Sequence, residues 1–318
     1  MGTRSAAEKP HSGERNYRAT IDNQGVTRSH VCRSATATGV SGRTPRGWGL
    51  GMEDIRRQPS ACGGTIDKVG VKNLSYPIVL LDKARRKQHT VARISMYVDL
   101  PREHRGTYMG RFVQILSRYH SEIDLHKVGA ILRDMRKELE ADSAHLEMEF
   151  PYFIEKAAPI SGVRGLMDYR CRVVAQLSDR FRLRLGAVVP VATLCPCSKE
   201  MVVTGAHNQR AEIRVEVEFR GFLWLEDLID MVEDCGSSEV YSLLEREDEK
   251  HVTALALQNP AFVEDVVRKV AKRLDEHPLV TGYEVAVESF ESIHHHDAYA
   301  YICRFPDAGD SGRIGGGW

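Results

Sequence analysis

The spacing of hydrophobic residues changes along this chain, and each spacing predicts a different kind of element. Between Thr90 and Val98 the apolar positions alternate imperfectly with polar ones, as in a half-buried strand with a local irregularity. Spacings of three and four residues then predict two helices, over 108–119 and 125–139, and Asp124 is placed to cap the second. The first regular segment is therefore a strand followed by a pair of helices.

A β-rich middle follows, and helices and strands then return. Alternating residues predict strands over 145–154, 166–177 and 181–191, with residues 178–180 as a short hairpin connection between the last two. The later pattern predicts a strand over 211–219, helices over 224–233 and 260–274, and strands over 283–290 and 298–305.

This order of elements describes two modules of one plan, each an antiparallel sheet with its helices on one face. It predicts an α+β fold and not a doubly wound parallel sheet. The prediction rests on element order alone, since the two halves share no detectable sequence repeat. The modules would cover 52–180 and 181–305.

Composition fits a globular protein with roughly two domain-sized cores, since 42% of the 318 residues are hydrophobic. The 44 basic and 44 acidic residues cancel, which removes the general electrostatic reason to expect nucleic acid or an anionic membrane as a partner. No apolar run approaches the roughly 20 residues that a membrane-spanning helix needs. We therefore expect neither nucleic acid nor a membrane as a partner.

The charge is unevenly distributed. Residues 1–51 hold eight Lys or Arg and three Asp or Glu, which leaves 36 basic and 41 acidic residues for the rest. This segment is rich in Gly and poor in apolar residues, so we predict a disordered leader. An over-long gene start is the favoured explanation, because Met52 stands where the globular pattern begins. Residues 306–318 are predicted to be a disordered tail.

Seven cysteines in a chain without an apolar secretory segment make a disulfide framework improbable and predict a reducing, cytoplasmic location. The most informative segment is LCPCSK (194–199), which leads to AHNQR (206–210). Two thiols one residue apart are poorly placed for a mutual disulfide, whereas one of them can bind a metal as thiolate and His207 can fold back as a nitrogen ligand. Ordinary buried or surface cysteines remain the alternative.

Two further segments carry candidate chemistry. In SIHHHD (292–297) an extended chain would direct His294 and His296 to one face, so at most two of the three histidines serve one site. Solvated loop histidines are the alternative. The charge run over 245–251 favours a solvated helix face, and Glu264 is explained equally well as a favourable charge at a helix N-terminus.

Five ordered motifs together resemble the prokaryotic type IB GTP cyclohydrolase family. They lie between about Met52 and Arg304: KVGVKNLSYPIVLLD (68–82), LCPCSK with HNQR, DEKHVT (248–253), NPAFVED (259–265) and ESIHHHDA (291–298). The resemblance implies a tunnelling fold, in which antiparallel sheets with helices on one side assemble by oligomerisation into a barrel. It also implies two modules per chain and a homotetramer with active sites at subunit interfaces.

The implied activity is conversion of GTP and water to 7,8-dihydroneopterin triphosphate and formate, the entry to tetrahydrofolate synthesis. By this resemblance Cys195, His207, Glu249 and His294 bind a divalent metal, with Zn favoured over Mn or Fe for a mixed sulfur, nitrogen and oxygen donor set. The ion would lower the pKa of a bound water and supply hydroxide to attack C8 of guanine, before ring opening, formate release and reclosure.

The resemblance also implies roles for the surrounding residues. His207 or His296 would carry protons during ring opening and closure. Glu264 would accept hydrogen bonds from guanine N1–H and the 2-amino group, a pair that adenine does not offer. Candidate cations for the triphosphate are Lys72, Lys199 and Arg210, while the role of Cys197 stays open.

Two other functions compete with this hypothesis. One is a tunnelling-fold nitrile reductase of queuosine synthesis, which uses a Cys nucleophile and NADPH and needs no histidine set around an ion. The other is a non-catalytic metal-binding or storage protein with the same fold.

Overall fold

A computed structural model describes residues 55–59, 62–119 and 123–306. All of these residues belong to one compact unit, which lies within residues 52–318. The predicted leader lies outside the described residues, as does the predicted tail beyond Pro306.

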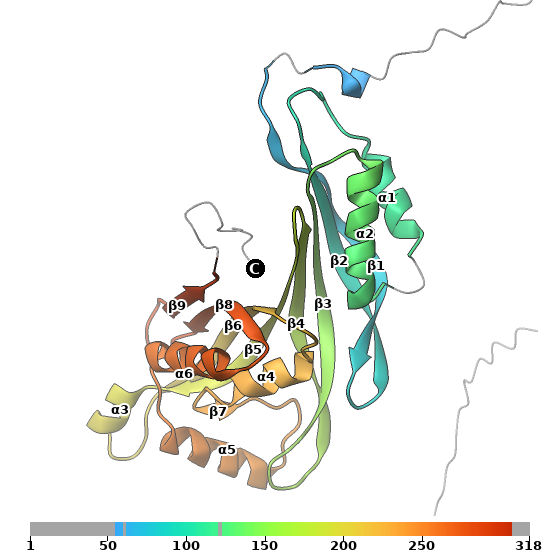
Figure 1. The fold of residues 1–318 in the computed structure, drawn as a ribbon. Helices are drawn as coiled ribbons and strands as arrows, with labels where there is room; N and C mark the ends of the chain where they lie inside the picture. Colours follow the sequence, from blue (N-terminus) through green and yellow to red (C-terminus); the bar gives the residue numbers. More distant parts are fainter. Residues whose placement is uncertain (1–54, 60–61, 120–122, 307–318) are drawn as a thin grey trace, which may run out of the picture. The chain divides into compact units, whose positions relative to one another are not determined.

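The described residues form one nine-stranded sheet in which every pairing is antiparallel (Figure 1). Its order is β1-β2-β3-β4-β5-β6-β8-β9, and β7 pairs with the end of β5. The strands are β1 (Ile66–Asp82), β2 (Arg86–Leu100), β3 (Ala144–Ala157), β4 (Arg164–Leu177), β5 (Phe181–Leu194), β6 (Asn208–Phe219), β7 (Ser238–Glu239), β8 (Val280–Ser289) and β9 (Ala298–Arg304).

The main helices cover one face of this sheet. Met148 lies opposite Val173, Val173 lies opposite Leu185, and all three are buried, so the core face runs without interruption from β3 to β5. Neighbouring positions such as Glu149 and Arg172 point to the other face. The helices are η1 (Ile55–Arg57), α1 (Met109–Ser117), α2 (Leu125–Glu138), α3 (Pro196–Met201), α4 (Leu225–Glu233), α5 (Arg246–Gln258) and α6 (Val263–Glu276).

The packing confirms the predicted α+β class with an antiparallel sheet. Helix α2 packs on β3 and β4, α4 packs on β5, and α6 packs on β8 and β9, and their apolar residues join one hydrophobic core with the strands. Along the chain, two strands, a group of helices and two strands occur twice, with the helix pair α1 and α2 in the first half and α4, α5 and α6 in the second, where α3 and β7 are additional. Because the sheet is continuous, the division into modules over 52–180 and 181–305 stays a prediction.

Most predicted elements are present, with shifted ends, and Asp124 caps α2 by accepting a hydrogen bond from the backbone N–H of Lys127 at 3.0 Å. The sequence pattern missed β1, α3 and β7, and of α5 it predicted only the solvated helix face of the charge run over 245–251. The pairing of β1 with β2 shifts register twice, and Asn73 at one shift has φ of 60°. Each shift interrupts the alternation of buried and exposed side chains, so the sequence of β1 lacks the regular pattern that predicts a strand. Helix α5 buries only Asp248 and Ala256, so its apolar stripe is too weak to detect.

No helix in the described ranges combines the length and the apolar character that a bilayer crossing requires.

Candidate active site

Cys195 stands at the junction between the end of β5 and the start of α3. It is the N-terminal cap of that helix, and its Sγ accepts a hydrogen bond from the backbone N–H of Ser198 at 3.5 Å. Pro196 occupies the first helical position, where its fixed φ and missing N–H are favourable. The local sequence therefore turns the chain sharply at the strand end and holds the sulfur there.

His207 folds back beside Cys195, as the sequence predicted. The backbone N–H of Cys195 donates to the carbonyl of His207 at 3.2 Å, because Leu194 on β5 pairs with Asn208 on β6. The backbone N–H of His207 in turn donates to Ser198 Oγ at 3.2 Å. Two residues that are twelve apart in sequence are thus joined through their backbones.

The loop between β8 and β9 brings further side chains to the same place. Glu291 Oε2 lies 3.9 Å from His207 Nδ1, and the two side chains are only 13% and 12% exposed. The rings of His207 and His294 meet edge to face with centroids 6.4 Å apart. His294 and His296 stack with centroids 5.2 Å apart, in agreement with the prediction that they share a face.

The N-terminus of α6 also reaches this strand end. The backbone N–H of Ala261 donates to the carbonyl of Leu194 at 3.1 Å, which places the first turn of α6, with the exposed Glu264, at the same end of β5 as Cys195. Lys199 is exposed on α3, and its backbone N–H donates to the carbonyl of Cys195 at 3.1 Å.

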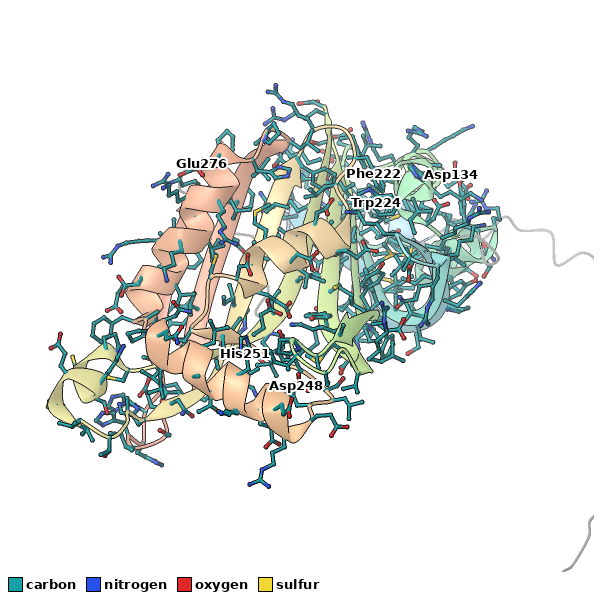
Figure 2. All side chains as sticks on the ribbon, turned by 90° about the horizontal axis from the view of Figure 1, so that it is seen from below. Asp134, Phe222, Trp224, Asp248, His251 and Glu276 are labelled. Atoms are coloured by element: carbon teal, nitrogen blue, oxygen red, sulfur yellow. The ribbon has the colours of Figure 1, made fainter. Side chains whose placement is uncertain are left out.

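One chain does not bring Glu249 to this cluster. Helix α5 is fixed at its beginning by the neighbouring Asp248, which accepts hydrogen bonds from Ile160 and Ser161 in the turn between β3 and β4 (Figure 2). The other end of α5 leads to Ala261. At 1.5 Å per residue, Glu249 lies about 14 Å along the helix from its last residue, Gln258, at the end near Cys195.

Lys72 and Arg210 are also separated from the cluster within one chain. Lys72 is on β1, four strands from β5, a distance of about 19 Å at the usual strand spacing. Arg210 is exposed on β6 next to Gln209, but strand alternation turns successive side chains to opposite faces, and Gln209 shares the face of His207.

The donor types at the strand end suit a divalent metal of borderline softness, because thiol, imidazole and carboxylate groups occur together. Their contacts are pairwise, His207 with Glu291 and His207 with His294. Among the residues that the structure describes, no three Cys, His, Asp or Glu side chains converge closely enough to hold an ion. The donor types therefore suit a metal, but the described residues of this single chain do not bring together all four predicted ligands, Cys195, His207, Glu249 and His294.

Sequence reasoning missed two side chains in this cluster, Glu291 and Gln209. Both stand inside segments that it singled out. Glu291 precedes His294 by three residues, and Gln209 follows His207 by two, the spacing that keeps side chains on one face of a strand. These two spacings are the only sequence signals that could assign Glu291 and Gln209 to the cluster, and without the fold neither spacing is specific for a functional site.

The sheet with one helix-covered face defines the class of antiparallel α+β proteins, and this one carries Cys, His and Glu side chains at a strand end. Within that class, the model of the family described as "Type I GTP cyclohydrolase folE2" matches residues 52–300. The chain belongs to this family of enzymes, which decides against the nitrile reductase.

Several relatives named "GTP cyclohydrolase FolE2" are similar over most of this chain. The protein of Citrifermentans bemidjiense is 57% identical over 253 residues, which are 80% of this chain and 95% of that protein. The protein of Geobacter sulfurreducens is 55% identical and covers 79% and 97%, and that of Syntrophotalea carbinolica is 52% identical and covers 80% and 96%.

Among solved structures, uricase from Arthrobacter globiformis has a TM-score of 0.47 at 7% identity, covering 77% of this chain and 95% of that one. A likeness at this level carries no argument about function.

Proposed function

We propose that this chain converts GTP and water to 7,8-dihydroneopterin triphosphate and formate, the first step of tetrahydrofolate synthesis, at the cluster around Cys195. The observation that carries the proposal is that the family match spans residues 52–300 and that His207 contacts Glu291 and His294 at the strand end where its backbone is hydrogen-bonded to that of Cys195. The cytoplasm is the proposed location.

The residues that would hold a divalent metal are Cys195, His207 and His294, and Glu291 joins them because it lies beside His207. Zn is the proposed ion, with Mn and Fe as alternatives, since the donor set mixes sulfur, nitrogen and oxygen. Such an ion activates water for hydrolysis when it is bound.

Glu264 would recognise the purine. It is exposed in the first turn of α6, and the hydrogen bond from Ala261 to Leu194 keeps that turn beside the cluster. Its carboxylate can accept hydrogen bonds from guanine N1–H and the 2-amino group. Adenine lacks this donor pair, so ATP would leave the carboxylate without partners.

Proton transfer would fall to His296 and His207. When the C8–N9 bond of guanine opens, N9 must gain a proton, and a nearby imidazole can deliver it and take one back on ring closure. His296 is exposed and stacked on His294, which leaves it accessible to substrate. His207 is more enclosed and fixed by hydrogen bonds.

The active site would be completed by another subunit of a homotetramer. Glu249 and Lys72 lie away from Cys195 within one chain, so they could reach a site only from a neighbouring copy. Large apolar side chains stand exposed near the cluster, with Met201 at 76%, Val203 at 103% and Ile293 at 67%. Exposed apolar groups of this kind mark interaction surfaces.

The proposal is tested by incubating the protein, loaded separately with Zn, Mn and Fe, with GTP. We expect formate, and a product that becomes a fluorescent pterin on oxidation, while the matched reaction with ATP gives neither. A flat signal with all three metals would instead support the non-catalytic alternative. Oxidation of NADPH with a nitrile substrate, without formate from GTP, would contradict the proposal.

A further inference from the structure

Gln209 is the centre of a hydrogen-bond network behind His207. Its side-chain Nε2 lies 3.3 Å from each of three acceptors, Thr193 Oγ1, Ser289 Oγ and Glu291 Oε1, which share the two hydrogens of the NH₂ group. Thr193 and Ser289 are only 2% and 1% exposed, and their hydroxyl oxygens are 3.0 Å apart. The amide of Gln209 is therefore held by three side chains from β5, β8 and the loop after β8.

The orientation of this amide follows from the chemistry of its neighbours. The Glu291 carboxylate only accepts hydrogen bonds when ionised, so the NH₂ group of Gln209 must face it. The amide oxygen then faces the other way, where it lies 3.0 Å from His207 Nδ1 and accepts from Ser292 Oγ at 3.3 Å.

An amide oxygen cannot donate, so the short contact with His207 requires a hydrogen on Nδ1. Glu291 Oε2, at 3.9 Å from the same nitrogen, favours the hydrogen there as well. The lone pair of the neutral ring then resides on Nε2, the nitrogen that forms neither of these contacts.

We propose that Gln209 is a positioning residue that holds His207 in the Nδ1–H tautomer and so leaves Nε2 to act as the metal-binding or proton-accepting atom. A hydrogen-bond partner on one ring nitrogen commonly fixes the tautomer and orientation of a functional histidine in this way. The inference deepens the proposed function and rests on it for the role of His207, but the tautomer itself can be measured without metal or GTP.

The test is a long-range ¹H–¹⁵N spectrum of the metal-free protein at a pH where imidazole is neutral. The His207 signal is assigned by its loss in His207→Gln. We expect the Nδ1–H form in the wild-type protein and in Ser292→Ala, which removes another partner of the same amide oxygen. Gln209→Leu should instead show the Nε2–H form or a mixture. An Nε2–H signal in the wild-type protein overturns the proposal, even if Gln209→Leu does not fold.

A second measurement is zinc affinity, determined by competition with a chelating dye for variants that match the wild-type circular dichroism spectrum. Gln209→Leu should bind zinc about 10- to 100-fold more weakly, whereas Ser292→Ala should bind it as the wild type does. Equal affinity for Gln209→Leu and the wild type overturns the positioning role. A wild-type protein with the Nδ1–H tautomer but no GTP turnover would overturn the proposed function and leave the tautomer assignment standing.

Discussion

Lys156 on β3 ties the first half of the sheet to the second. Its Nζ lies 2.8 Å from Glu233 Oε2 on α4 and 2.7 Å from Glu239 Oε2 on β7, and it donates to the carbonyl of Val240 at 3.1 Å. The side chains of Lys156 and Glu233 are 12% and 6% exposed. Tyr169 donates to the second oxygen of Glu233 at 2.6 Å.

Replacing Lys156 by Met would leave the Glu233 carboxylate buried without its cation. Two unit charges 2.8 Å apart attract by about 6 kcal/mol at an effective dielectric constant of about 20. Desolvation and side-chain entropy offset part of this, and removing one partner of a buried pair costs about 3–5 kcal/mol in practice. We expect Lys156→Met to lower the free energy of unfolding by about that amount.

Removing the charge of the other partner, in Glu233→Gln, should lower the free energy of unfolding much less. In Glu233→Gln, Lys156 keeps Glu239 and the Val240 carbonyl, and Tyr169 can donate to the new amide oxygen. We expect a loss of at most about 1.5 kcal/mol, the scale of one hydrogen bond. A surface control is Lys83→Met, because Lys83 and its partner Asp227 are 40% and 44% exposed. It should cost no more than about 1 kcal/mol.

The assay is urea unfolding at one fixed protein concentration, since oligomerisation affects apparent stability. Trp224, next to α4, is the one tryptophan among the described residues and reports on this junction. Burial raises the pKa of Glu233 and Lys156 opposes this, so the pKa should rise further in Lys156→Met. The cost should then shrink as pH falls and Glu233 takes a proton. Equal costs for Lys156→Met and Lys83→Met would refute the reasoning.

Three further predictions concern the site and the helix-free face. Cys195→Ala should lose bound metal and GTP turnover together, while Cys303→Ala, which changes an exposed thiol on β9, keeps both; unchanged metal content in the first variant would overturn the ligand assignment. Glu264→Ala should keep its metal but lose about 100-fold or more in kcat/KM for GTP, with Glu276→Ala at the other end of α6 (Figure 2) as control; equal kinetics would exclude the guanine contact. Burial, aided by Glu284, raises the pKa of Glu216 above its ordinary 4.5, so its stabilising contribution is greatest at low pH and is lost as pH rises through the folded-state pKa. Glu216→Gln should therefore gain stability relative to the wild type as pH rises from about 4.5 to 8, and a constant difference in urea midpoints would contradict this.

The fold could be predicted where burial imposes a period on the sequence. Strand β6 buries Ile213, Val215 and Val217 against the helices, and α6 buries a stripe that includes Val266 and Val270, so each element has the repeat of its geometry. Where an element is anchored by polar contacts, no such repeat exists. Helix α5 is held by the buried carboxylate of Asp248. In the sequence, Asp248 cannot be told apart from the exposed charged residues on either side of it.

The site was predictable only as far as its residues are close in sequence or share a motif. Cys195 and His207 are joined by strand pairing, which follows once β5 and β6 are recognised as neighbours. The contact of Glu291 with His207 depends on β6 pairing with β8 across a long connection that contains three helices. No local pattern encodes that pairing, so a carboxylate at the centre of the cluster went unassigned.

The small excess of acidic residues outside the leader limits how this chain could bind a triphosphate. Outside the leader, 36 basic residues face 41 acidic ones, so no general positive field draws in a polyanion. Of the three predicted cations, only Lys199 is joined to Cys195 in this chain, through a backbone hydrogen bond, since Arg210 turns to the face opposite to Gln209 and Lys72 lies four strands from β5. A single cation is a poor match for three phosphates, whereas copies arranged so that one chain's β1 meets another's β5 end would add Lys72. Electrostatics and the position of Glu249 thus both support the proposed interfacial site.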